Sequence, residues 1–539
     1  MISNFDKSPE VKIKGFDSGC FAGWNAIITR LKQEIARNHN AKKIIVIEYY
    51  QGIHIAEILD SLVKKLSANA FFDSAEAMLP EDKIREITFP DVTDDRIFGF
   101  MTRLNMDDFY DPAKVDALRA KIIAVEKGTI LVYGTGAAMV IPEPDLLIYA
   151  DMARWEIQKR MKRHEVSNLG ITNFDENFES QYKRAYFVDW RICDRLKKKV
   201  MNKLDYILDT NLVDSPVMLS AEAFSEGMQQ IISQPYSVVP FFDAGPWGGQ
   251  WMKEKLDLDK SYENYAWCFN CILEENSIYL RFGETRFETP AINLTFLKAV
   301  ELLGDAVQAR FGDEFPVRFD FLDTIKGGNL SVQVHPVTEY IQEKFWIPYT
   351  HDESYYIMEA DEQANVYLVL KEEIDPKSMI RDLREAERDA SRFDNTTYIQ
   401  KWPAKKHDHF LIPGGTVHCS GKGCLVLEIS ATPYIFTFKL WDWGRLGMDG
   451  RPRPINIDHG IENIKWNRTT TWVGNNLINQ FDKIDEGDGW REERTGLHKR
   501  EFIETRRHWF TKKVHHHTNE GVNVLALVEG REIIVESPS

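Results

Sequence analysis

The stretch that decides the fold of the C-terminal half is NLSVQVHP, residues 329–336. Its alternating apolar and polar residues are typical of a β-strand. Side chains two positions apart on a strand share a face, so Gln333 and His335 point one way while Val332 and Val334 point the other. An amide oxygen beside an imidazole offers ligands for a divalent cation of borderline softness.

Two further segments place ligand-type side chains on predicted strands. Glu353 opens a strand in HDESYYIMEA (351–360), and His418 follows a Pro-Gly-Gly turn in FLIPGGTVHCSGKG (410–423). With Gln333 and His335 they provide the nitrogen and oxygen ligands that Zn²⁺ accepts, with room for water or substrate. Each residue alone has a plainer interpretation, because a single strand histidine is more often a polar core residue. The four together form the candidate metal site.

The surrounding sequence predicts an all-β region with helical inserts. From about residue 235, short strand candidates such as ANVYLVLKEEI and CLVLEIS alternate with Gly, Pro, Asn and Asp turns. Many short strands with turn signals indicate a sandwich or barrel. We expect SIYLRFG (277–283) to belong to this region, and helical inserts at residues 294–312 and 376–393.

The N-terminal part has a different pattern of predicted secondary structure. β-Branched apolar runs at residues 43–50, 129–136 and 145–152 alternate with helical patterns, which predicts parallel βαβ units. A basic helix is expected over residues 188–204, and its RLKKKV run is interpreted as a solvated face. The boundary between the α/β pattern and the all-β pattern falls within residues 213–237.

Bulk properties exclude some classes of function. The chain has 539 residues, enough for two to four domains. Its net charge of −16 argues against a general nucleic-acid binder. With no apolar run of roughly 18 residues, no membrane span is expected, and we predict a cytoplasmic protein. The six cysteines contain one CxxC pair, Cys268 and Cys271, which is interpreted as packing.

Four blocks carry a family resemblance. They are GGNLSVQVHPVTEY, THDESYYIMEADEQANVYLVLK, HFLIPGGTVHCSGKGCLVLEIS and KLWDWGRLGMDGRPRPINID, preceded by VVPFFDAGPWGGQWM. Their order over residues 236–475 resembles class I mannose-6-phosphate isomerases. The resemblance implies a cupin (jelly-roll) fold with zinc held by Gln333, His335, Glu353 and His418. It also implies interconversion of mannose 6-phosphate and fructose 6-phosphate through an enediol.

The same resemblance implies a catalytic set with departures. Glu428 matches a family active-site acid, and Lys439 and Arg445 are candidate phosphate or oxyanion partners. Two positions where the family has lysine carry Asp320 and His351, and Lys439 stands where it has arginine. The cations that could substitute are Arg445, Arg318 and Lys422. A sugar or sugar phosphate is therefore the expected partner, and the alternative is a non-catalytic sugar-binding or regulatory protein.

The N-terminal half resembles a uridine-kinase-like nucleoside kinase in residues 100–122, 128–136 and 145–166. The corresponding phosphate loop, EYYQGIHIAEI (48–58), keeps Gly52 but lacks the lysine and the Ser or Thr of GxxxxGK[ST]. ATP binding and phosphoryl transfer are therefore not expected. The resemblance further implies a substrate-side acidic pair and a basic lid, formed by Asp107, Asp108, Arg160 and Arg163.

Together these patterns predict a multidomain chain. Residues 1–215 form a degenerate nucleoside-kinase-like α/β domain, 216–235 a linker, 236–475 the zinc-binding cupin and 476–539 a partial second cupin sheet. His515, His516 and His517 are adjacent, so they cannot all face one metal from a regular strand and are expected to be structural.

Overall fold

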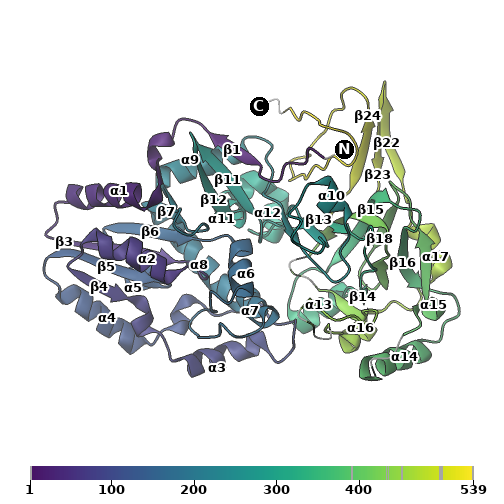
Figure 1. Cartoon of the computed structure of the whole chain (residues 1–539), viewed down its shortest axis with the longest axis horizontal. Coiled ribbons are helices and arrows are strands. Elements are labelled where there is room, and N and C mark those ends of the chain that lie inside the picture. Colours follow the sequence, from purple (N-terminus) through teal and green to yellow (C-terminus); the bar gives the residue numbers. More distant parts are fainter. Residues whose placement is uncertain are drawn as a thin grey trace. The chain divides into compact units, whose positions relative to one another are not determined.

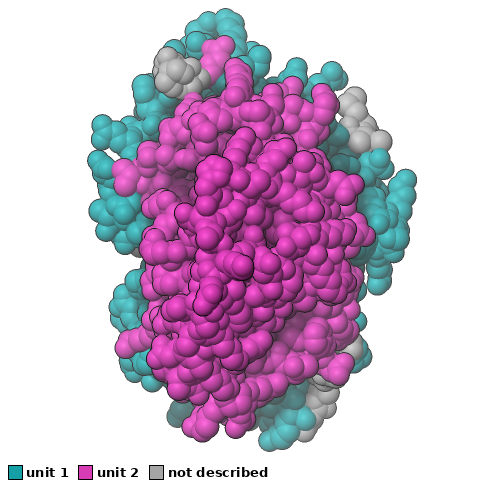
Figure 2. Space-filling view, turned by 90° about the vertical axis from the view of Figure 1, so that its left-hand side faces the viewer, with its two compact units in different colours: residues 1–7, 240–272, 303–535 teal, residues 8–239, 273–302, 536–539 magenta. Residues whose placement is uncertain are grey.

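The computed structural model describes residues 3–389, 393–432, 434, 436–448, 450, 453–496 and 502–536. The chain divides into two compact units, coloured separately in Figure 2. The β unit consists mainly of Pro240–Ile272 and Leu303–Val535, and the α/β unit mainly of Ser8–Val239 and Leu273–Leu302. No helix among the described residues is both long and apolar enough to cross a membrane.

The α/β unit is built around a seven-stranded sheet with the order β2-β8-β7-β6-β3-β5-β4. Figure 1 labels its strands β3 to β7. At its centre β3 (Lys42–Tyr49) runs parallel to β5 (Gly128–Gly134) and β6 (Leu146–Asp151), which confirms the predicted parallel strands. The remaining strands are β2 (Cys20–Ala22), β4 (Ala70–Asp73), β7 (Tyr206–Asp209) and β8 (Val217–Ser220). The helices include α1 (Gly23–Arg37), α2 (Ile55–Ser61), α3 (Glu81–Val92), α4 (Pro112–Ala124), α5 (Ala137–Val140), α6 (Arg154–Lys162), α7 (Phe178–Arg184), α8 (Trp190–Val200) and α9 (Ala221–Ile232).

The segment Leu273–Leu302 belongs to the α/β unit, although the sequence places it in the all-β region. Its strands β11 (Ser277–Phe282) and β12 (Thr285–Pro290) form a hairpin, and β11 pairs in parallel with β1 (Glu10–Ile13). Local strand and turn patterns do not reveal a pairing partner so far away in the chain. The predicted helical insert at 294–312 is observed as α11 (Ile292–Leu303) and α12 (Asp305–Phe311).

The basic run on α8 is not wholly solvated as expected. Lys197 is 1% exposed, and its ammonium group donates hydrogen bonds to Asp151 (2.7 Å) and Asn293 (3.1 Å). It also lies 4.3 Å from the centre of the Tyr50 ring. A buried charge requires such partners, so this lysine joins α8 to the end of β6 and to the helix after β12.

Replacing Lys197 with alanine should lower the free energy of unfolding by about 3–5 kcal/mol, because the Asp151 carboxylate would remain buried without its partner. Urea unfolding followed by circular dichroism measures the change. The matched control is Lys199→Ala, two residues along the same helix and exposed, which should change stability by less than about 0.5 kcal/mol. Equal losses in both variants would contradict the argument.

Two carboxyl groups meet where β7 and β12 approach each other. The backbone N–H of Glu288 donates to the Asp209 carboxylate at 2.8 Å. Burial raises the pKa of Asp209 from 3.8 to about 6. Burial, together with the charge of Asp209, raises the pKa of Glu288 from 4.5 to about 7. The folded state therefore holds these protons to higher pH than the unfolded chain does.

This pair predicts that stability falls as pH rises from about 4 to about 7, because the folded state binds more protons than the unfolded state in that range. Glu288→Gln cannot lose its proton, so the decline should become shallower. Unfolding free energies measured across this pH range for both proteins provide the test. An identical slope in the variant would contradict the prediction.

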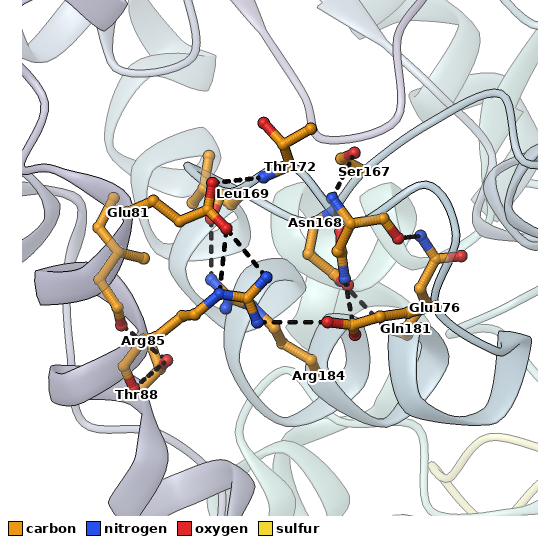
Figure 3. Close-up of polar contacts among 12 residues, drawn as sticks. Glu81, Arg85, Thr88, Ser167, Asn168, Leu169, Thr172, Glu176, Gln181 and Arg184 are labelled. Carbon is orange, nitrogen blue, oxygen red and sulfur yellow. Dashed lines mark hydrogen bonds and ion pairs between the residues drawn. The ribbon is translucent and has the colours of Figure 1, made fainter.

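The loop between α6 and α7 in the α/β unit is held in place by polar side chains (Figure 3). The Asn168 side-chain amide donates to the backbone carbonyl of Gln181 at 3.0 Å, and the Gln181 side-chain amide donates to the backbone carbonyl of Asn173 at 2.9 Å. Arg85 links α3 to the same loop by donating to Glu176 at 3.2 Å. The segment between α6 and α7 is therefore fixed to the unit by its own hydrogen bonds.

The β unit contains two antiparallel sheets, as expected for a jelly roll. One has the order β18-β15-β20-β13-β10-β9 and the other β17-β16-β19-β14-β21. The strands are β9 (Phe241–Asp243), β10 (Trp267–Phe269), β13 (Arg318–Asp323), β14 (Val332–Val334), β15 (Asp352–Ala360), β16 (Asn365–Leu370), β17 (Ile399–Pro403), β18 (His409–Ile412), β19 (His418–Ser420), β20 (Cys424–Ala431) and β21 (Phe438–Trp441). The helices are α10 (Trp251–Lys255), α12, α13 (Thr338–Phe345), α14 (Pro376–Asp389), α15 (Asn395–Tyr398), α16 (Ile457–Asn463) and α17 (Thr470–Asn476). The helix predicted over 376–393 corresponds to α14, and residues 390–392 lie outside the described part of the chain.

The C-terminal region forms a small separate sheet of β22 (Asp482–Gly487), β23 (Trp490–Arg494) and β24 (Arg506–Phe510). Among the described residues after β24, none is assigned to a helix or strand. His515, His516 and His517 are exposed in this part. The partial second cupin sheet over residues 476–539 stays a prediction.

Candidate metal centre

One wall of the candidate site is formed by three adjacent strands. In the cross-strand register, Glu428 on β20 lies between Asp320 on β13 and Tyr355 on β15. Directly paired residues share a face of a sheet, and so do residues two apart on one strand. Glu353, two residues before Tyr355, therefore lies on the same face as the two other carboxyl groups.

The second sheet contributes the remaining predicted ligands. Gln333 on β14 pairs with His418 on β19 and, on its other side, with Lys439 on β21. His335 follows directly after β14. Pro413 and the two glycines after it make the turn that leads into β19, and Gly415 adopts a positive φ of 84° there. The predicted turn thus delivers His418 to the strand beside Gln333.

The two predicted histidine ligands converge on the Glu353 carboxylate, and Gln333 contacts one of them. His418 Nε2 lies 2.7 Å from one carboxylate oxygen, and His335 Nε2 lies 3.2 Å from the other. The Gln333 amide lies 3.2 Å from His418 Nε2. Glu353 and His335 are 1% exposed and His418 is 0% exposed. Four residues from three separate segments of the chain therefore meet in one buried place.

The hydrogen bonds of the two histidines define which nitrogen is free to bind a cation. His335 Nδ1 lies 2.9 Å from the Phe436 carbonyl, and His418 Nδ1 lies 2.9 Å from the Thr416 carbonyl. A carbonyl only accepts, so each Nδ1 donates to it, which leaves each Nε2 facing Glu353 and available to a cation when the ring is neutral. Burial lowers the pKa of His335, which favours the neutral ring. Lone pairs facing a carboxylate repel it unless a cation lies between them, so this donor set fits a zinc ion.

The two other carboxyl groups on the wall favour their protonated forms. Burial raises the pKa of Glu428 well above its ordinary range, and the nearby charge of Glu353 raises it further. Burial likewise raises the pKa of Asp320, with added repulsion from Glu428. The guanidinium of Arg318, two residues before Asp320 on β13, opposes both shifts without reversing them. A neutral carboxylic acid beside a metal site can donate a proton.

The predicted cations differ in how they are placed. Arg445 donates to the Asn329 carbonyl at 2.6 Å and to the Asp442 carboxylate at 2.5 Å, so its guanidinium is engaged with neighbouring loops. Lys439 stands in register with Gln333 on the sheet that carries His418. Residues 449, 451 and 452 of the same sequence block lie outside the described part of the chain.

His351 belongs to this cluster, although sequence reasoning treated it only as a lost lysine. Its Nε2 lies 3.3 Å from Glu353, and its ring centre lies 3.7 Å from that of His335. His335, His351 and Glu353 could together hold a metal ion, since their ligand atoms all lie within 4.8 Å of one another. The i, i+2 spacing of His351 and Glu353 was the available signal, because such residues share a face of an extended chain.

The candidate residues of the N-terminal half do not form a comparable site. Arg160, expected in a lid, is 0% exposed and donates to the carbonyl groups of Gly52 (3.0 Å) and Thr210 (2.9 Å). Arg163 pairs with Glu165 and Glu156 at the surface. The exposed Asp108 accepts the N–H of Asn105 at 2.7 Å, within the short helical turn that also contains Asp107.

Comparisons with known proteins agree with parts of these observations. A family described as "Domain of unknown function (DUF8485)" matches residues 23–233. The chain is 30% identical to a mannose-6-phosphate isomerase of Streptococcus mutans over an alignment of 175 positions, which covers 30% of this chain and 50% of that protein. The mannose-6-phosphate isomerase ManA of Bacillus subtilis is 32% identical over 29% of the chain and 45% of its own length.

The chain thus spans about half the length of the curated relatives it matches, and about 30% of it is homologous to mannose-6-phosphate isomerases. A solved mannose 6-phosphate isomerase from Bacillus subtilis aligns with a TM-score of 0.39 and 19% identity, over 48% of this chain and 76% of that one. The nucleoside-kinase-like fold of the N-terminal half stays a prediction.

Proposed function

We propose that this chain is a zinc-dependent aldose–ketose isomerase that interconverts mannose 6-phosphate and fructose 6-phosphate. The observation that carries the proposal is the convergence of His335 and His418 on the buried Glu353 carboxylate, with Gln333 beside them. The partial homology to mannose-6-phosphate isomerases supports the same reaction class.

Gln333, His335, Glu353 and His418 would hold the ion. When bound, zinc would polarise the carbonyl oxygen of the sugar as a Lewis acid. The carbonyl groups of Phe436 and Thr416 orient the two imidazoles, because each accepts the Nδ1–H of one ring. Such outer contacts fix the ring tautomer that a metal requires.

The reaction moves a proton between adjacent carbon atoms of the sugar through an enediol. Glu428 is our candidate acid and base, because its side chain lies on the wall that carries Glu353 and it favours the protonated form. Lys439 is our candidate for the phosphate or the developing oxyanion. Arg445 is assigned to a positioning role, because it binds the loops at Asn329 and Asp442.

One observation favours a second candidate, a non-catalytic sugar-binding protein. Asp320 contributes a third carboxyl group to the wall, and resemblance to the isomerase family leads us to expect a lysine there. If ionised, this carboxyl group would cost the affinity for a substrate phosphate roughly 1–4 kcal/mol. In the protonated form that burial favours, it still lacks the positive charge of a lysine. Turnover therefore has to be separated from binding.

The deciding experiment measures conversion of fructose 6-phosphate, and of unphosphorylated fructose, by the purified chain before and after removal of metal with a chelator. We expect turnover of the phosphorylated sugar to fall to background on chelation and to return when zinc is added. Zinc binding without turnover of either sugar would favour the second candidate. Turnover that resists complete metal removal would contradict the proposed mechanism.

A further inference from the structure

His351 has a buried position that the proposed function does not use. The side chain is 4% exposed, and neither ring nitrogen makes a hydrogen bond within the described part of the chain. A buried polar group without a partner is costly, so such a group needs an explanation. Its Nε2 is directed towards Glu353, at 3.3 Å from the oxygen that His335 also faces.

We propose that His351 is an additional ligand of the metal centre, so that three imidazoles, from His335, His351 and His418, bind the ion together with Glu353 and Gln333. The inference rests on the metal site of the proposed function and concerns the composition of its coordination shell.

The distances fit ligands arranged around one ion. Metal–nitrogen and metal–oxygen bonds of about 2.0–2.2 Å place neighbouring ligand atoms about 3 Å apart. The Nε2 atoms of His335 and His351 lie 3.2 and 3.3 Å from the same Glu353 oxygen, and His418 Nε2 lies 2.7 Å from the other oxygen. His335, His351 and Glu353 are therefore already at the spacing that a shared cation would produce, and His418 approaches the same carboxylate at its other oxygen.

A role for His351 as a cation for the sugar phosphate fits less well. Its ring is tilted by 30° over the ring of His335 at 3.7 Å, and its Nε2 points to the carboxylate at the centre of the ligand cluster. Glu428 lies next nearest, 3.9 Å from the same nitrogen. The ring thus lies among the other ligands, where a bound ion would accept the lone pair of Nε2.

Five protein donors exceed the three or four that zinc sites usually contain. The centre should therefore accept ions that favour five or six ligands, such as Co²⁺ or Ni²⁺, as readily as zinc. The substrate class would be unchanged, but fewer positions on the ion would remain for the sugar.

The test counts imidazoles in the full chain loaded with Cu²⁺, using pulsed electron paramagnetic resonance, and measures the Kd for Zn²⁺ by competition with a chelating dye. We expect three imidazoles in the unmodified protein and two in His351→Ala. We also expect Zn²⁺ to bind at least about tenfold more weakly in the variant, since loss of outer-shell groups alone costs that much. His351→Asn serves as a second variant if the first does not fold. The control is His407→Ala, which lies outside the ligand cluster and should keep three bound imidazoles.

The outcomes separate this inference from the proposed function. Two imidazoles in the unmodified protein, with an unchanged zinc Kd in His351→Ala, would overturn the role of His351 and leave the four-ligand site intact. Weaker binding of inorganic phosphate in that variant, with an unchanged imidazole count, would overturn it in favour of a phosphate contact. Failure of the unmodified protein to bind any divalent ion would overturn both proposals.

Discussion

His418→Ala is expected to abolish tight zinc binding and to lower sugar-phosphate turnover at least about a thousandfold. The imidazole is 0% exposed and its Nε2 lies 2.7 Å from Glu353, so its removal leaves a gap in the ligand set beside that carboxylate. Loss of Lewis-acid assistance removes several kcal/mol of transition-state stabilisation, and about 4 kcal/mol corresponds to a thousandfold in rate.

Zinc content, the zinc Kd and the initial rate with fructose 6-phosphate provide the measurements. The matched control is Cys419→Ala, the next residue on β19, whose side chain projects to the opposite face of the strand. The control should keep its metal and its activity. Full zinc occupancy in His418→Ala would contradict the ligand assignment, and equal loss in both variants would point to damage to the strand.

The strand patterns of the metal centre were predictable because each ligand is marked locally. The alternation of apolar and polar residues assigns Gln333 and His335 to one face of a strand. The Pro-Gly-Gly turn predicts that a new strand, which carries His418, begins after it. Register across strands has no such local signal. The pairing of Glu428 with both Asp320 and Tyr355 depends on contacts between segments about 70 to 110 residues apart. The depth at which His351 lies was missed for the same reason.

The division into two units also could not be predicted from local sequence patterns alone. The pattern of β11 predicts an ordinary short strand, and only its pairing with β1 and β12 places Leu273–Leu302 in the α/β unit. The burial of Lys197 was missed because a run of basic residues on a helix usually faces water. Its partner Asp151 lies 46 residues earlier at the end of β6, where the sequence pattern predicts only the strand.

Glu428→Gln is expected to lower kcat by about 100- to 10,000-fold while zinc remains bound, which is the range for loss of a general acid or base. The amide matches the carboxyl group in size but cannot exchange a proton with the sugar. Because Glu428 is not among the proposed ligands, its removal should leave the zinc Kd within about threefold. The separation of rate from metal affinity distinguishes this variant from His418→Ala.

The control for Glu428→Gln is Ser430→Ala, two residues along β20 and on the same face, in register with Glu353. A hydroxyl group at that position has no assigned role in proton transfer, so kcat should change by less than about fivefold. If Glu428→Gln kept near-normal kcat, the proton would have to move through another group. Asp320 would then be the first to examine, since its carboxyl group is paired with Glu428 across the strands and burial raises its pKa in the same direction.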